Sequence, residues 1–228
     1  MISVINDTMV REGHVWDWSR AIMVTDPPFN VGYHYNEYKD RMGEKEYFGS
    51  LYERARLFKR GYVLILPPTT LSAYSAYTGE IPTWEYAWVY PSNTASQFRL
   101  IGFFGVMPDK SRVLQPPRQP DDPRNRGKEG VRMYDWFEIP QVKNVSKGRV
   151  GYDHPCIMPV EVMKRVINTL PRDAIVVDPY LGSGTTLVAC KELGYDGVGV
   201  EMSREYCDLA RSRLREDRLP RREQVIYK

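Results

Sequence analysis

A run of four residues, Asp26, Pro27, Pro28 and Phe29, combines an acid, a rigid turn and an aromatic ring. The exocyclic amine of a nucleobase is a poor nucleophile, because its lone pair is delocalised into the ring. A protein can localise this lone pair by accepting both N–H hydrogens, and the Asp26 carboxylate and the Pro27 carbonyl suit those roles. The prolines fix φ and remove two backbone donors, while Phe29 offers a face for an unstacked base. The run therefore predicts catalysis by positioning; the structural alternative is a rigid turn with Phe29 in the core.

A second run, residues 178–186, reads Asp-Pro-Tyr-Leu-Gly-Ser-Gly-Thr-Thr. Gly182 and Gly184 let the backbone approach a ligand and turn from strand to helix. Glu201, 23 residues after Asp178, is placed to accept from ribose hydroxyls. A ligand carboxylate or phosphate would meet the helix N-terminus and the hydroxyls of Ser183, Thr185 and Thr186. A dinucleotide fits these features too, but the loop is neither Gly-x-Gly-x-x-Gly nor a Walker sequence.

Alternating strands and helices are expected to position both runs. Each run directly follows a predicted strand, where open α/β sheets bind their ligands. The order strand, helix, strand over residues 21–66 predicts a right-handed crossover with parallel pairing. Strands are predicted over 2–5, 21–24, 62–66, 84–90, 98–107, 174–178 and 197–201, and helices over 44–60, 71–77, 159–170, 185–193 and 203–218. The stretch 30–35 either closes over a substrate or forms a surface loop.

Composition indicates an ordinary globular protein of 228 residues, with 42% hydrophobic and 27% charged residues. The net charge of +3 is compatible with nucleic-acid binding but does not by itself indicate it. Three cysteines without Cys-x-x-Cys spacing indicate a reducing compartment and no disulfide framework. Three unclustered histidines predict no metal site. Because neither a signal segment nor a run of membrane-spanning length is present, we expect a cytoplasmic protein.

Residues 108–153 differ in character from the rest of the chain. They hold six prolines and ten Lys or Arg against seven Asp or Glu, an excess equal to that of the whole chain. Irregular backbone of this length within a domain is usually functional or disordered. One interpretation is a nucleic-acid-contacting segment, with basic side chains on phosphates and Trp136 or Phe137 as a wedge or stacking group. The other is a solvated loop.

Both runs and their order resemble the amino-type DNA methyltransferases. Thr25 to Asn30 is similar to the catalytic motif of that family, and residues 154–214 are similar to its cofactor-binding half. The catalytic motif precedes the cofactor motif here, which resembles the permuted β group. Two departures are Met158-Pro159, where the family usually has Lys-Pro, and Phe29 in place of the commoner tyrosine.

The resemblance implies an α/β fold with a Rossmann-like, seven-stranded mixed sheet in circularly permuted motif order. It implies S-adenosylmethionine as cofactor, DNA as partner, base flipping and a homodimer, in a restriction-modification setting of a bacterium or phage. In this reading Asp26, Pro27, Pro28 and Phe29 engage the base. The implied cofactor-binding residues are Asp178, Pro179, Tyr180, Gly182, Ser183, Gly184, Thr185, Thr186, Glu201, Met202 and His154.

The chain is expected to form one methyltransferase domain with three parts. Residues 1–107 would be the catalytic half, residues 108–153 the recognition segment and residues 154–228 the cofactor-binding half. The resemblance leans the target towards adenine, because the first catalytic position is Asp rather than Ser. Three alternatives remain open: the same chemistry on the cytosine 4-amino group or on RNA, a non-catalytic nucleic-acid-binding domain, and a dinucleotide oxidoreductase.

Overall fold

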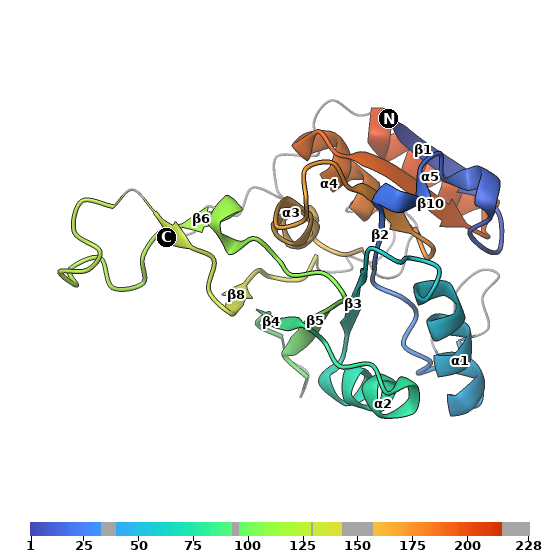
Figure 1. The fold of residues 1–228 in the computed structure, drawn as a ribbon, viewed down its shortest axis with the longest axis horizontal. Coiled ribbons are helices and arrows are strands. Elements are labelled where there is room, and N and C mark those ends of the chain that lie inside the picture. Colours follow the sequence, from blue (N-terminus) through green and yellow to red (C-terminus); the bar gives the residue numbers. More distant parts are fainter. Residues whose placement is uncertain (33–39, 93–95, 129, 143–156, 216–228) are drawn as a thin grey trace.

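A twisted sheet forms the centre of the protein, in a computed structural model that describes residues 1–32, 40–92, 96–128, 130–142 and 157–215 (Figure 1). Its strand order is β1-β10-β9-β2-β3-β5-β4-β8. The strands are β1 (Ile2–Asn6), β2 (Ala21–Thr25), β3 (Tyr62–Leu66), β4 (Trp84–Val89), β5 (Phe98–Phe104), β8 (Trp136–Glu138), β9 (Ile175–Asp178) and β10 (Asp196–Glu201). The seven expected strands are all present, and the short β8 adds an eighth beside β4.

Seven of these eight strands run in one direction, and β5 is antiparallel to its neighbours β3 and β4. The crossover from β2 to β3 is parallel, with Val24 opposite Val63, as the strand–helix–strand order predicts. The chain leaves β9 towards β10 on one side and leaves β2 towards β3 on the other. The order therefore reverses between β9 and β2, and such a switch point is where open α/β sheets bind ligands.

Among the residues that the structure describes, five α-helices cover the sheet: α1 (Glu44–Ala55), α2 (Pro68–Thr78), α3 (Val160–Asn168), α4 (Thr185–Leu193) and α5 (Arg204–Arg215). Alternate residues of β2 enter different cores, because successive strand side chains point to opposite faces. Ile22 and Val24 pack in one core with residues of α3 and α4. Ala21 and Met23 pack in the other with residues of α1 and α2. The sheet is thus covered on both faces.

The helix predicted over residues 44–60 is shorter in the structure and ends at Ala55. The chain turns there, because the amide of Leu57 bonds to Arg54 and that of Phe58 to Ala55. This turn brings Phe58 into the core, where its side chain is 3% exposed. Burial of one aromatic ring has overridden a helical pattern of charges, which continues to Arg60.

Residues 114–128 and 130–132 extend from the body of the protein as an arm, seen at the left of Figure 1. A two-stranded sheet of β6 (Leu114–Gln115) and β7 (Val131–Arg132) closes the arm near its base. Trp136 to Glu138 then return to the main sheet as β8. The predicted irregular segment is therefore tied to the sheet at its C-terminal side.

We expect Gly184→Ala to destabilise the fold more than Gly194→Ala. Both glycines have positive φ, +85° and +73°, so each substitution strains the backbone by about 1 kcal/mol. A Cβ at Gly184 would also lie 2.7 Å from the Cβ of Ala210, whereas one at Gly194 meets no atom within 4 Å. Overpacking of this kind adds about 1–3 kcal/mol. Urea denaturation measures both losses, and equal losses would show that α5 moves aside freely.

Candidate functional site

A cavity of about 240 Å³ opens where four parallel strands end. Residues just after β1, β2, β9 and β10 all line it, because parallel strands bring their carboxyl ends to one edge of the sheet. Thirteen predicted site residues are in its wall: Asp26, Pro27, Pro28, Phe29, Asp178, Pro179, Tyr180, Gly182, Ser183, Thr185, Thr186, Glu201 and Met202. The two predicted runs therefore form one site. His154 lies outside the described residues, and Gly184 supports the wall from behind, against Ala210.

Asp178 holds the glycine-rich loop to its strand. Its Oδ1 accepts hydrogen bonds from Thr25 Oγ1 at 2.8 Å and from the backbone amide of Tyr180 at 3.0 Å. Its Oδ2 accepts from Thr186 Oγ1 at 2.5 Å. Burial raises the pKa of Asp178 to about 6. The three hydrogen-bond donors lower this pKa, and the negative charge of Asp26 raises it. The carboxylate is therefore ionised at neutral pH, but its charge depends on its donors.

Glu201 fixes the other side of the same loop. Its Oε2 accepts from the amide of Gly182 and its Oε1 from the amide of Ser203, both at 2.8 Å. Each carboxylate oxygen has two lone pairs, so each can accept from a ligand hydroxyl as well as from an amide. The arrangement places an acidic group at the end of β10 facing the cavity.

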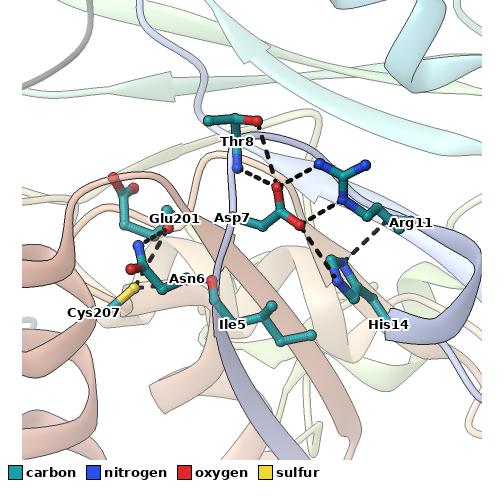
Figure 2. Close-up of polar contacts among 8 residues, drawn as sticks. All are labelled: Ile5, Asn6, Asp7, Thr8, Arg11, His14, Glu201 and Cys207. Atoms are coloured by element: carbon teal, nitrogen blue, oxygen red, sulfur yellow. Dashed lines mark hydrogen bonds and ion pairs between the residues drawn. The ribbon is translucent and has the colours of Figure 1, made fainter.

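The end of β1 is locked to the end of β10, as Figure 2 shows. Asn6 Nδ2 donates to the carbonyl of Glu201 at 2.9 Å. Asp7, the next residue, accepts from Arg11 Nε at 2.6 Å and from Nη2 at 3.0 Å. His14 Nε2 lies 3.7 Å from the same carboxylate. The Arg11 guanidinium holds the pKa of Asp7 well below its usual range, so a permanent negative charge lines this part of the cavity.

The Asp26–Phe29 turn is anchored from several directions. Tyr47 of α1 donates its hydroxyl to the carbonyl of Pro28 at 2.7 Å. Asn30 adopts φ +61° and exchanges two hydrogen bonds with the backbone of Met42, at 2.9 and 2.6 Å. Burial raises the pKa of Asp26 to about 6, and Arg99 counteracts this increase. Residues 33–39, which include much of the predicted loop 30–35, lie outside the described residues.

The loop hydroxyls are already engaged within the protein. Arg213 of α5 is 2% exposed and donates from Nη1 to Ser183 Oγ at 2.9 Å and to Thr185 Oγ1 at 3.0 Å. Thr185 in turn lies 3.2 Å from the carbonyl of Met158. Met158, the departure from the family pattern, thus contributes its backbone to the loop and its side chain to the cavity wall.

Sequence reasoning missed several residues of the site. Asp7 follows β1 directly, so the rule that placed Asp26 and Asp178 at strand ends would have found it. Arg99 is a buried charge in the apolar strand β5, a pattern that is itself a signal. Leu181 lies within the second run and Met158 at the departure from the family pattern, but neither was predicted to line the site. The remaining cavity residues carry no such signal and are brought in by packing: Thr8, Arg54, Met163, Ser203 and Tyr206.

Among the described residues, no group of three or more His, Cys, Asp or Glu side chains is arranged to hold a metal ion. No helix in the described ranges has the length and apolar character needed to cross a membrane.

The fold is that of a class of solved methyltransferases, one of which was solved with S-adenosylmethionine. M1.HpyAVI, solved with S-adenosylmethionine, matches with a TM-score of 0.62 and 18% identity, over 94% of this chain and 100% of its own. The cytosine-N4-specific PvuII DNA methyltransferase matches with a TM-score of 0.68 and 17% identity, over 97% and 89%. Within this class, a family profile described as DNA methylase, of the N6/N4 type, matches residues 74–212. The chain belongs to this DNA methylase family.

Curated relatives are type II methyltransferases. M.ScaI of Streptomyces caespitosus is 40% identical over 89 residues, which is 37% of this chain and 29% of the relative. M.HpaI of Haemophilus parainfluenzae is 23% identical over 218 residues, which is 85% of this chain and 67% of the relative. The chain therefore spans about a third of the first relative and two thirds of the second.

We expect Thr25→Val to weaken the fold in a pH-dependent way. The substitution removes the Thr25 donor to Asp178 and costs about 1–3 kcal/mol while that carboxylate is ionised. Because this donor favours the ionised form, its removal raises the pKa of Asp178 above the wild-type value of about 6, and the loss is full only above this raised pKa. It shrinks as the pH falls through that value. Urea denaturation from about pH 8 to about pH 5 measures the change.

Thr169→Val is the matched control for this substitution. Thr169 is as buried as Thr25, and its hydroxyl donates to the carbonyl of Val166 at 2.7 Å. Its loss should be independent of pH in the same range, because a backbone carbonyl does not titrate there. A Thr25→Val loss that is equally flat would contradict the role assigned to the bond.

Proposed function

We propose that the protein is a site-specific DNA methyltransferase that modifies the exocyclic amine of adenine. The observation that carries the proposal is that the Asp26–Phe29 turn and the loop 178–186 line one cavity. Family membership supports the general activity on adenine N6 or cytosine N4. The choice of adenine rests on Asp26 at the first catalytic position.

The cavity fits S-adenosylmethionine by the chemistry of its wall. The carboxylates of Asp7 and Glu201 can accept from amine or hydroxyl groups of an adenosine. Met158, Met163 and Leu181 supply apolar surface. Tyr180 presents a ring to the same cavity, over which Arg54 lies at 5.3 Å from the centroid. When bound, this cofactor supplies a methyl group on a positively charged sulfur.

The protein's own residues would prepare the amine. The Asp26 carboxylate and the Pro27 carbonyl accept its two N–H hydrogens, and this localises the nitrogen lone pair. Phe29 lies in the cavity wall beside them, where its ring can support a flipped base. The methylated nitrogen gives up one proton, and Asp26, with a pKa of about 6, is a suitable acceptor.

Cytosine is the second candidate target. The PvuII enzyme, which shares the fold over 97% of this chain, is cytosine-N4-specific by its description. In both reactions a planar exocyclic amine is the nucleophile that attacks the methyl group, and both need the same two acceptors. The two acceptors therefore suit either base, and the proposal of adenine rests only on the resemblance, in which Asp at the first catalytic position accompanies adenine.

Asp26→Ala should abolish methyl transfer and leave cofactor affinity within about threefold, because the acceptor that it removes serves the target amine, while the loop 178–186 keeps its own hydrogen bonds. The wild-type and variant proteins are expressed in a bacterium without DNA methylation, and its DNA is digested to nucleosides for mass spectrometry. The expected product is 6-methyladenine, absent from the variant. A product of 4-methylcytosine would change the base and keep the mechanism. Wild-type protein that binds the cofactor but modifies no DNA would point to RNA or a binding domain.

The proposal assigns DNA contact to the arm and to the rest of segment 108–153. Arg118, Arg124, Arg126, Lys128 and Arg132 are exposed along it. The Arg118 guanidinium lies 3.2 Å from the ring centroid of Trp136, which is 42% exposed. Basic groups interleaved with an aromatic ring suit phosphate contact and base stacking. The catalytic half, the recognition segment and the cofactor-binding half, with the boundaries given above, remain the proposed organisation, and dimerisation stays a prediction.

Arg126→Ala combined with Lys128→Ala should weaken DNA binding and lower its salt dependence. Each lost phosphate contact reduces the slope of log affinity against log salt by about 0.9. The control is Lys45→Ala combined with Lys59→Ala, an equal change of charge on α1 and the turn after it, at the opposite end of Figure 1. Fluorescence anisotropy at several salt concentrations measures both. If both double variants reduce the slope of log affinity against log salt equally, the arm does not contact DNA specifically.

A further inference from the structure

Arg99 is a charged residue inside an apolar strand. It lies in β5 next to Phe98 and Leu100, and its relative exposure is 9%. Burying a guanidinium is unfavourable unless an opposite charge and hydrogen bonds compensate for it. The side chain must therefore have a partner that justifies its position.

That partner is the Asp26 carboxylate. Arg99 Nη1 lies 3.1 Å from Oδ2 and 3.3 Å from Oδ1 of Asp26, which is 73 residues away in the chain. The guanidinium also lies over the ring of Phe29, 4.6 Å from its centroid, and over that of Trp88 at 5.4 Å. Trp88 is the β4 residue paired with Arg99 in the sheet. One side chain thus contacts both the acid and the ring of the Asp26–Phe29 turn.

The surroundings of Asp26 disfavour its ionised form. Burial raises its pKa, and Arg99 opposes this increase through its charge and its hydrogen bonds. The ionised carboxylate of Asp178 shares the cavity, and the two acids repel each other. The other charged groups in the wall are Asp7, Glu201 and Arg54. Without Arg99, a proton on Asp26 would relieve both the burial and the repulsion.

We propose that Arg99 is a positioning residue that keeps Asp26 in its ionised, hydrogen-bond-accepting form and holds the ring of Phe29 beside it. This inference rests on the proposed function, because it assigns to Asp26 the role of acceptor for the target amine. A protonated Asp26 would carry a hydrogen on one oxygen and would meet the N–H of the amine as a donor. Arg99 contacts Asp26 through one nitrogen, and each carboxylate oxygen has a second lone pair for the amine.

The first test needs neither cofactor nor DNA. The carboxyl carbon of Asp26 is followed by ¹³C NMR as the pH is changed, and Asp26→Asn identifies its signal. We expect the pKa to rise by about one unit or more in Arg99→Met, because a charge within contact distance is lost. Arg99→Lys, which keeps a positive charge, should raise it by less than half as much. Arg99→Gln replaces Arg99→Met if the latter does not fold.

The second test is the pH profile of methyl transfer by the same variants. Activity needs the ionised acid, so it should fall as the pH drops through the pKa of Asp26. In Arg99→Met this acidic limb should move to higher pH, with activity partly recovered above it. Arg60→Met is the matched control, because Arg60 pairs with Asp173 at 2.8 Å on the surface. Its acidic limb should coincide with that of the wild type.

Opposite results would overturn the inference. A signal of Asp26 that titrates alike in wild type and Arg99→Met would show that Arg99 does not control its charge. Activity lost equally at every pH would assign Arg99 a purely structural role. Failure of the proposed function gives a different result: the wild type would then methylate no DNA, while the NMR titration still decides between the two roles of Arg99.

Discussion

The buried hydrogen bond from Thr25 to Asp178 joins residues that are 153 positions apart. Thr25 ends β2 and precedes the Asp26 turn, and Asp178 ends β9 and begins the glycine-rich loop. These strands are parallel neighbours, with Met23 opposite Val177. The chain departs from this pair in opposite directions across the sheet, so the loops that follow leave a cavity between them. The meeting of the two chemical motifs depends on this one strand pairing.

Much of this arrangement was predictable because buried parallel strands leave a strong mark on a sequence. The apolar runs at β2, β3 and β9 are short, contain Val and Ile, and end at proline or aspartate. Once they were recognised as strands, the side chains after them had to gather at one edge. That rule also applied to Asp7 after β1. Asp7 was not predicted to line the site, because it belongs to no recognised motif.

Other features were not predictable because their cause lies in distant parts of the chain. The end of α1 at Ala55 depends on burial of Phe58, which only the packed sheet provides. Strands β6 and β7 have two residues each and β8 has three, too few to show an alternating pattern. A charged residue such as Arg99 within an apolar strand is recognisable from the sequence. Its partner Asp26, however, could be identified only from the pairing of β5 with β3 and of β3 with β2.

The charge of the cavity separates the two kinds of cofactor that the loop could bind. Four acids, Asp7, Asp26, Asp178 and Glu201, stand in its wall with Arg54. Arg11 pairs with Asp7 and Arg99 with Asp26 from outside the wall, so the charges of these two acids are partly compensated. Asp178 and Glu201 are stabilised by hydroxyl and amide donors, which leave their charge in place. Such a wall attracts a cationic ligand and repels an anionic one. A dinucleotide would bring a negatively charged diphosphate to this loop, whereas a sulfonium brings a positive charge. The electrostatics of the folded site therefore favour the sulfonium, a distinction that the glycine pattern alone did not make.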